Sequence, residues 1–269
     1  MKKILLIVEG AKTEPAFFKG LLRQFGLEAE LFVVGTNLYS LYAKCKAYEF
    51  ACDIRDVLRE IVPDEEICET LYHEKFTYTY LVFDADLHNK SPHLRKIKQD
   101  VTIADRLTDN FPKLIEMAEH FTDETDPTIG RLYINYPMME SYRYCDTCEE
   151  EGYPAPEISI DKMAEFKKCA STKCLAGKNI DTYTRADFTN LICMNLGRLK
   201  SVAAPCFDRL TDYETYLDVS TAKNIADCQA VKISNEAKLY VLNTSLFLIV
   251  DYYGNQNGFY DTVITPDTP

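Results

Sequence analysis

The sequence predicts an α/β fold, with a mostly parallel sheet flanked by helices and with a helical C-terminal part. Short apolar runs at residues 3–10 and 76–83 are typical of buried parallel strands, and the alternating segment 130–136 predicts a further strand. Amphipathic helical patterns separate these runs, and such alternation of strand and helix indicates a parallel sheet. We therefore predict an α/β domain over residues 1–145 and a mostly helical extension over residues 146–269 that packs on it.

The composition is that of a globular protein, with 46% hydrophobic and 27% charged residues in a chain of 269. The formal net charge of −12 gives no general attraction to nucleic acid or to anionic membranes, so a polyanionic partner would need a local basic patch or bridging metal ions. No apolar run reaches membrane-spanning length, and no signal peptide precedes the first strand. We expect a cytoplasmic protein without a membrane partner.

The first half of the chain alternates between strand and helix patterns. The first strand ends at Glu9, and we expect Thr13 to be the N-cap of the helix that follows. A second strand is predicted over Glu30–Val34. The segment Leu38–Ile61 carries apolar residues at near-helical intervals and predicts one long amphipathic helix. A further helix is expected over residues 103–120, broken or restarted at Pro112.

The alternating segment Gly130–Tyr136 predicts a fourth strand, and a helix is expected to begin near Pro137. In the second half, helical patterns cover residues 160–168, 184–200 and 221–228. The segment Tyr240–Tyr253 is apolar on nearly every side, which favours a buried helix over a strand. We expect the tail from Gly254, which carries Gly, Asn, Asp and Pro, to be loose.

Four acidic residues follow strands of the predicted sheet: Glu9, Asp84, Asp86 and Glu140. Sites in open α/β sheets lie beyond the carboxyl ends of the strands, so parallel strands would gather these carboxylates at one edge. Asp84 and Asp86 would face one space if the chain stays extended, because residues two apart share a face of a strand. Crowded carboxylates need a proton or a cation, and Mg²⁺ or Mn²⁺ takes oxygen ligands. The alternative is that each acid is a solvated loop residue.

Three basic residues are candidates for phosphate contacts beside these acids. Lys12 lies close to Glu9 in sequence, Lys90 belongs to the basic stretch 88–100, and Arg143 lies about one helical turn past Glu140. The alternatives are an exposed charged loop for Lys90 and an ion pair with a nearby acid for Arg143.

The cysteines permit two interpretations. Cys145 and Cys148 form a C-x-x-C pair, and Cys169 and Cys174 follow at a wider spacing. Structural zinc is one interpretation, and free reduced thiols are the other.

Three segments of the chain form a pattern: Leu6-Ile7-Val8-Glu9-Gly10-x-x-Thr13-Glu14-Pro15, then Val82-Phe83-Asp84-x-Asp86, then Pro137-x-x-Glu140. Together they resemble the Toprim-type nucleases of bacterial defence systems, in particular RloB-like proteins. The resemblance covers roughly residues 3–145. It implies a Toprim-like catalytic domain in which Glu9 serves acid–base chemistry or metal binding and Asp84 and Asp86 bind Mg²⁺. Glu140 would match a further family acid. The region after residue 145 matches no module of this family.

These observations lead us to expect a Mg²⁺-dependent nuclease that cleaves DNA or RNA, with tRNA among the candidate substrates. The resemblance implies a role in anti-phage defence with a separate ATPase partner, since the chain has no P-loop of its own. Two alternatives remain open at this point. One is a haloacid-dehalogenase-like phosphatase with Asp84 as the nucleophile, which the segment Val82-Phe83-Asp84-Ala85-Asp86 also fits. The other is a non-catalytic regulatory subunit that keeps the acids as a metal-stabilised scaffold.

Overall fold

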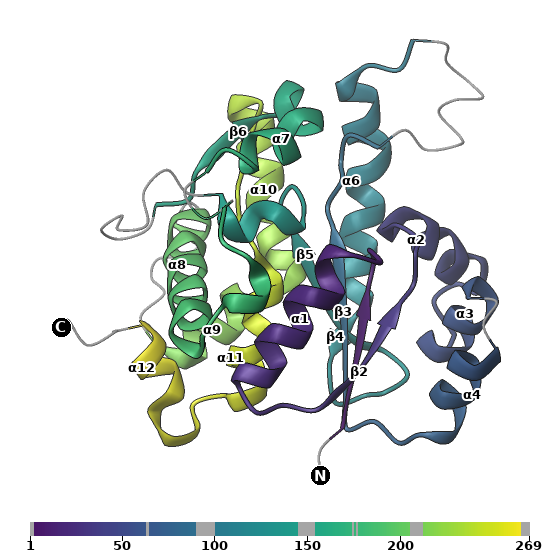
Figure 1. Ribbon diagram of the computed structural model, residues 1–269. Helices are drawn as coiled ribbons and strands as arrows, with labels where there is room; N and C mark the ends of the chain where they lie inside the picture. The colour runs from purple at the N-terminus through teal and green to yellow at the C-terminus, as the bar shows by residue number, and fades with distance from the viewer. Residues whose placement is uncertain are drawn as a thin grey trace.

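The computed structural model describes residues 3–62, 65–89, 100–144, 154–173, 175, 177–204 and 212–264. Its centre is a five-stranded sheet of order β2-β1-β3-β5-β4 (Figure 1). The strands are β1 (Ile4–Val8), β2 (Ala29–Val33), β3 (Tyr78–Asp84), β4 (Thr122–Asp123) and β5 (Gly130–Asn135). Neighbouring strands are parallel except β4, which pairs with β5 in the antiparallel sense. The prediction of a mostly parallel α/β sheet is confirmed, and the two-residue β4 was not predicted.

The central strands are apolar because both of their faces are covered. All five residues of β1 are buried, and so are Thr79–Phe83 of β3. Figure 1 shows α2, α3 and α4 on one side of the sheet, and α1 on the other side with α8, α9, α11 and α12. In the first half the helices are α1 (Thr13–Gln24), α2 (Leu38–Ala47), α3 (Ile54–Ile61), α4 (Glu65–His73), α6 (Ile103–His120) and the 3-10 helix η1 (Met139–Arg143).

The second half is mostly helical, as expected, and also contains a small antiparallel pair, β6 (Glu157–Ser159) with β7 (Lys238–Tyr240). Its 3-10 helices are η2 (Ile160–Glu165), η3 (Ile180–Thr182), η4 (Thr244–Leu246) and η5 (Gln256–Gly258). Its α-helices are α7 (Phe166–Ala170), α8 (Arg185–Ala203), α9 (Tyr213–Val219), α10 (Ala222–Glu236), α11 (Phe247–Tyr253) and α12 (Phe259–Ile264). None of the helices in the described ranges combines the length and the apolarity needed to cross a membrane.

The C-terminal part is joined to the end of β5 by polar contacts as well as by apolar packing. Tyr136 and Leu242 exchange two backbone hydrogen bonds, at 2.8 and 2.9 Å, and the Thr244 hydroxyl donates to the Ile134 carbonyl at 2.9 Å. On β5 itself, Arg131 forms an ion pair with the buried Asp251 of α11 at 3.2 Å. The predicted boundary at residue 145 lies outside the described residues, as do Cys145, Cys148 and Cys174 of the zinc hypothesis.

The expected helix Leu38–Ile61 is wrong, because the chain forms two helices, α2 and α3, with a turn between them. Glu49 and Phe50 adopt the left-handed region, with φ of 51° and 58°. The Phe50 ring packs against His120 at 4.9 Å between ring centroids, so tertiary packing outweighs the local helical pattern. A new helix then begins after Asp53, whose side chain accepts a hydrogen bond from the Arg55 N–H at 2.9 Å.

Two predictions about helix signals are wrong. Pro112 lies inside α6 without breaking it. The apolar face of α6 packs into the core through Leu107, Leu114 and Met117, and this burial outweighs the one backbone hydrogen bond that a proline removes. Thr13 is the first residue of α1 and not its N-cap, which is Lys12 without a capping side chain.

The C-terminal predictions need two further corrections. The segment Tyr240–Tyr253 is helical only in its second half, because residues 238–240 form β7 and Leu242 pairs with Tyr136. The tail was expected to be loose from Gly254, but it is folded as far as Ile264, where α12 ends, and Tyr260 is fully buried. Aromatic packing of Tyr260 against Tyr213 and Tyr216, at 5.5 and 5.3 Å between ring centroids, stabilises this end of the chain.

Candidate acidic site at the carboxyl edge of the sheet

The first acid of the site, Glu9, comes directly after β1, the strand that pairs with β2 on one side and β3 on the other. Since β1 is buried throughout, the chain reaches the edge of the sheet with little freedom at this point. The Glu9 carboxylate points across to β3, where its Oε2 accepts a hydrogen bond from the Asp84 N–H at 3.3 Å. Two predicted site residues from strands far apart in sequence are therefore in contact.

Asp84 is the last residue of β3, opposite Asn135 of β5. The chain then leaves the extended conformation, because Asp86 has a φ of 37°. The expectation that Asp84 and Asp86 share a face through an extended chain is therefore wrong, although both still lie at this edge. The Asp86 N–H donates to the Pro137 carbonyl at 3.2 Å, which ties the loop after β3 to the loop after β5.

The side chain of Asp86 has two neighbours on its own loop. Asn89 donates from Nδ2 to Asp86 Oδ2 at 3.2 Å, and His88 Nδ1 lies 3.9 Å from Asp86 Oδ1. The backbone between the two aspartates is held from outside the loop, since the Tyr39 hydroxyl of α2 donates to the Ala85 carbonyl. Tyr39 was not singled out in the sequence, which carries no signal that this tyrosine reaches the site.

Glu140 lies in η1, the short helix after β5, and is buried. Its Oε1 forms an ion pair at 2.7 Å with Nζ of Lys167, a residue of α7 in the C-terminal part. The backbone of η1 is held by Arg198 of α8, whose guanidinium donates to the carbonyls of Ser141 and Tyr144 at 3.2 and 2.5 Å. Neither Lys167 nor Arg198 was identified from the sequence.

The electrostatics show that these acids share one environment. Burial, with a further contribution from the charge of Asp86, raises the pKa of Glu9 to about 8. Burial also raises the pKa of Asp84 well above its usual range, with added repulsion from Glu9 and Asp86 and smaller contributions from Glu14 and Glu140. The pKa of Asp86 is raised mainly by burial and is partly lowered again by His88. Four predicted site acids and Glu14 therefore repel one another at one edge of the sheet.

Glu14 has a local structural role within this group. Its Oε1 accepts a hydrogen bond from the Gly10 N–H at 2.9 Å, so it fixes the turn between Glu9 and α1. A side chain at position 10 would collide with this carboxylate, since a Cβ there would come within 2.3 Å of Glu14 Oε2. Gly10 therefore leaves the space that the Glu14 carboxylate occupies beside Glu9.

The three basic residues predicted to contact phosphate lie in different surroundings. Lys12 is exposed just before α1. Arg143 is half-buried at the end of η1, with its guanidinium 5.9 Å from the centroid of the Tyr142 ring. Lys90 lies outside the described residues, together with most of the basic stretch 88–100.

The carboxylates of this site are suitable ligands for a hard divalent cation, because they supply oxygen atoms, are buried and repel one another. Within the described ranges, no three His, Cys, Asp or Glu side chains are placed so as to hold one metal ion together. Mg²⁺ is usually held by only one or two carboxylates, with water and substrate oxygens completing its shell. Asp84 and Asp86 could supply that number, whereas Glu140 already has an ammonium partner.

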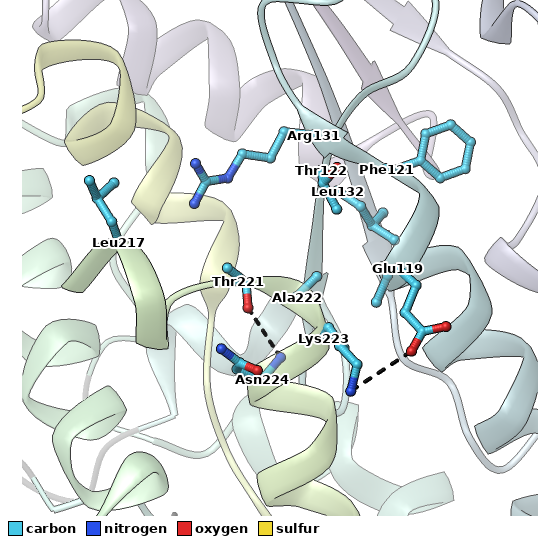
Figure 2. Close-up of a pocket in the computed structure, with 11 residues that line it drawn as sticks. Glu119, Phe121, Thr122, Arg131, Leu132, Leu217, Thr221, Ala222, Lys223 and Asn224 are labelled. Carbon is cyan, nitrogen blue, oxygen red and sulfur yellow. Dashed lines mark hydrogen bonds and ion pairs between the residues drawn. The ribbon is translucent and has the colours of Figure 1, made fainter. Parts of the chain in front are cut away.

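A cavity of about 470 Å³ lies at the opposite end of β5, between α6 and the start of α10. Figure 2 shows Arg131, Thr221 and Lys223 among its lining residues. Its two cations already have acidic partners, since Lys223 lies 2.6 Å from Asp227 and Arg131 lies 3.2 Å from Asp251. This cavity does not include the predicted site acids.

Comparison of the chain with protein-family models, with curated proteins and with solved structures finds no significant match in any of the three.

Proposed function

We propose that the chain is a Mg²⁺-dependent nuclease that hydrolyses phosphodiester bonds of DNA or RNA, with Mn²⁺ as a substitute ion. The observation that carries the proposal is the contact between Glu9 and Asp84 at the carboxyl edge of the parallel sheet, with Asp86 and Glu140 beside them. Carboxylates with strongly raised pKa values, gathered where α/β sheets place their sites, are typical of metal-binding or catalytic groups.

In this proposal Asp84 and Asp86 hold the divalent ion, which would activate water and offset charge on the leaving oxygen. Glu9 acts as the general base. Its pKa of about 8 lies close to neutral pH, where a carboxylate can both accept and return a proton. Asn89 orients Asp86 through its hydrogen bond, and Tyr39 holds the backbone between the aspartates. Glu140 belongs to the wall of the site.

The resemblance of residues 3–145 to Toprim-type, RloB-like nucleases supports the same proposal and extends it to anti-phage defence. On this basis we also propose a cytoplasmic location and a separate ATPase partner. The fold is compatible with a Toprim-like domain, since such a domain is a mostly parallel, Rossmann-like sheet flanked by helices.

The test is cleavage of single-stranded DNA, double-stranded DNA and RNA, including tRNA, with Mg²⁺ or Mn²⁺ and with EDTA as the control. Glu9→Gln should lower the rate by at least about 100-fold, since positioned acid–base groups contribute about 10²–10⁴-fold. Asp84→Asn should also lower it strongly, because it removes a ligand of the divalent ion. Asp218→Asn, which changes an exposed aspartate of α9, should leave the rate unchanged. Undiminished cleavage by both site variants would overturn the proposal.

Two other results would replace the proposal with its alternatives. A phosphorylated Asp84, trapped from a phosphomonoester substrate and located by mass spectrometry, would identify a phosphatase. Stabilisation by Mg²⁺ without cleavage of any phosphodiester, also in the presence of an ATPase partner, would indicate a non-catalytic subunit.

A further inference from the structure

We propose that Lys167, supplied by the C-terminal part, is a substrate-binding residue that contacts a phosphate of the nucleic acid. This inference rests on the proposed function and deepens it, because it gives the C-terminal part a direct role at the acidic site. It follows from one contact across the molecule, the ion pair between Lys167 Nζ and Glu140 Oε1 at 2.7 Å.

The two partners of this ion pair differ sharply in exposure. The side chain of Glu140 is 4% exposed, whereas that of Lys167 is 69% exposed. The ammonium therefore lies at the boundary between the buried acids and solvent. An ammonium has three N–H donors, and Glu140 accepts from one of them. Its position and its exposed stem leave it accessible to an anion that approaches the acids from outside.

The backbone that carries Lys167 is fixed against the site and is not a free arm. Its neighbour Phe166 is fully buried and stacks on Tyr144, with 4.8 Å between ring centroids and an interplanar angle of 25°. Tyr144 follows η1 directly, and its carbonyl accepts from the buried Arg198. The position of the Lys167 ammonium is thus set by the same segment that carries Glu140.

The charge around the site explains why such a cation is needed. Every phosphate of a nucleic acid is an anion, and the site acids Asp84, Asp86 and Glu9 repel it whenever they are ionised. The Lys167 ammonium is attracted to Asp84 and Glu14 as well as to Glu140, so its charge acts on acids of β3 and α1 in addition to its direct partner. In a chain of net charge −12, a fixed cation at this place offsets the repulsion where the substrate must enter.

The experiment compares Lys167→Met, Lys167→Arg and the matched control Lys168→Met, which alters the next residue of the same helix, also exposed. Binding is measured by fluorescence anisotropy of a labelled single-stranded 12-mer, as RNA and as DNA, in Ca²⁺. Cleavage is measured in Mg²⁺. Lys167→Met should weaken binding and raise KM by about 10-fold or more, with a smaller change in kcat. Lys167→Arg should retain most binding, and Lys168→Met should match the wild type.

The salt dependence supplies a second measurement. Lys167→Met removes one phosphate contact, so the slope of the logarithm of the binding constant against the logarithm of the salt concentration should become shallower by about 0.7–0.9. The other two variants should keep the slope of the wild type. Circular dichroism checks that all three variants are folded.

The outcomes separate this inference from the proposed function. If the wild type binds the 12-mer without cutting it and Lys167→Met weakens binding, the nuclease proposal fails and the role of Lys167 stands. If the wild type cuts the substrate and Lys167→Met has the affinity, KM and salt slope of Lys168→Met, the role of Lys167 is overturned. A wild type that neither binds nor cuts overturns both.

Discussion

The carboxylate of Glu9 accepts a hydrogen bond from the backbone N–H of Asp84 at 3.3 Å, although the two residues are 75 positions apart in the sequence. This contact fixes the distance between the end of β1 and the end of β3. It also brings one buried carboxylate close to another. Burial is the main cause that raises both pKa values; the charge of Asp86 adds to the rise for Glu9, and the charge of Glu9 adds to it for Asp84.

The raised pKa of Glu9 predicts that the metal-free protein loses stability as the pH rises. A carboxyl with a pKa of about 8 in the folded state and an ordinary value of 4.5 stabilises the fold fully below pH 4.5, and this contribution is lost as the pH rises through 8. Urea unfolding in EDTA should show the loss in the wild type and a weaker dependence in Glu9→Gln. The difference should reach a few kcal/mol, since each pKa unit corresponds to about 1.4 kcal/mol. Parallel curves for the two proteins would contradict this prediction.

Neutralising Asp84 should stabilise the metal-free protein and weaken its response to Mg²⁺. Asp84→Asn removes a charge that repels Glu9 and Asp86, so we expect a gain of about 1 kcal/mol or more, which corresponds to about 2–4 °C in Tm for a chain of this size. The stabilisation of the wild type by Mg²⁺ should be mostly lost in the variant. Thermal unfolding with and without Mg²⁺ measures both effects, with Asp218→Asn as the control. An equal response of wild type and Asp84→Asn would argue against an ion at this site.

Removal of the buried Arg198 guanidinium should destabilise the protein strongly. Arg198→Met leaves the carbonyls of Ser141 and Tyr144 without this donor, and we expect a loss of about 2–4 kcal/mol. Arg185 provides a matched control, because it also donates to a backbone carbonyl, that of Gln24 at 3.3 Å, but at an exposed position. Arg185→Met should cost less than about 1 kcal/mol in urea unfolding. Similar losses for both variants would show that burial of Arg198 does not matter.

The C-cap of α10 offers a stabilising change. Ala237 has a φ of 54°, in the left-handed region where a Cβ is unfavourable. Ala237→Gly should therefore raise the free energy of unfolding by about 0.5–1 kcal/mol. Ala204 follows α8 with an ordinary helical φ of −49°, so Ala204→Gly should not stabilise. A loss of stability in Ala237→Gly would contradict the prediction.

Strands β1 and β3 were predictable from the sequence because they are buried on both faces and therefore form continuous apolar runs, as in Ile4–Val8. The order of the strands then brings Glu9 beside Asp84, as parallel pairing implies. The helical pattern of residues 38–61 was misleading, because packing of Phe50 against His120 decided the turn. A local pattern contains no information about such a partner 70 residues away.

The cation of the site was not predictable for a similar reason. Lys167 belongs to the run Phe166-Lys167-Lys168, which in sequence is an ordinary charged helix. Only the packing of Phe166 on Tyr144 places one of the two lysines beside Glu140. Likewise, nothing in the sequence shows that Asp86 adopts a left-handed conformation, which changes how the two aspartates are presented.

The ion pair between Glu140 and Lys167 also has a consequence for synthesis on the ribosome. The acids at positions 9, 84, 86 and 140 are all made before Lys167, and Arg198 and Asn243, which hold the segment around Glu140, come later still. A nascent chain lacks this cation and these supports until the segments that carry them have left the ribosome. The acidic site can therefore mature only after the chain as far as Asn243 has left the ribosome.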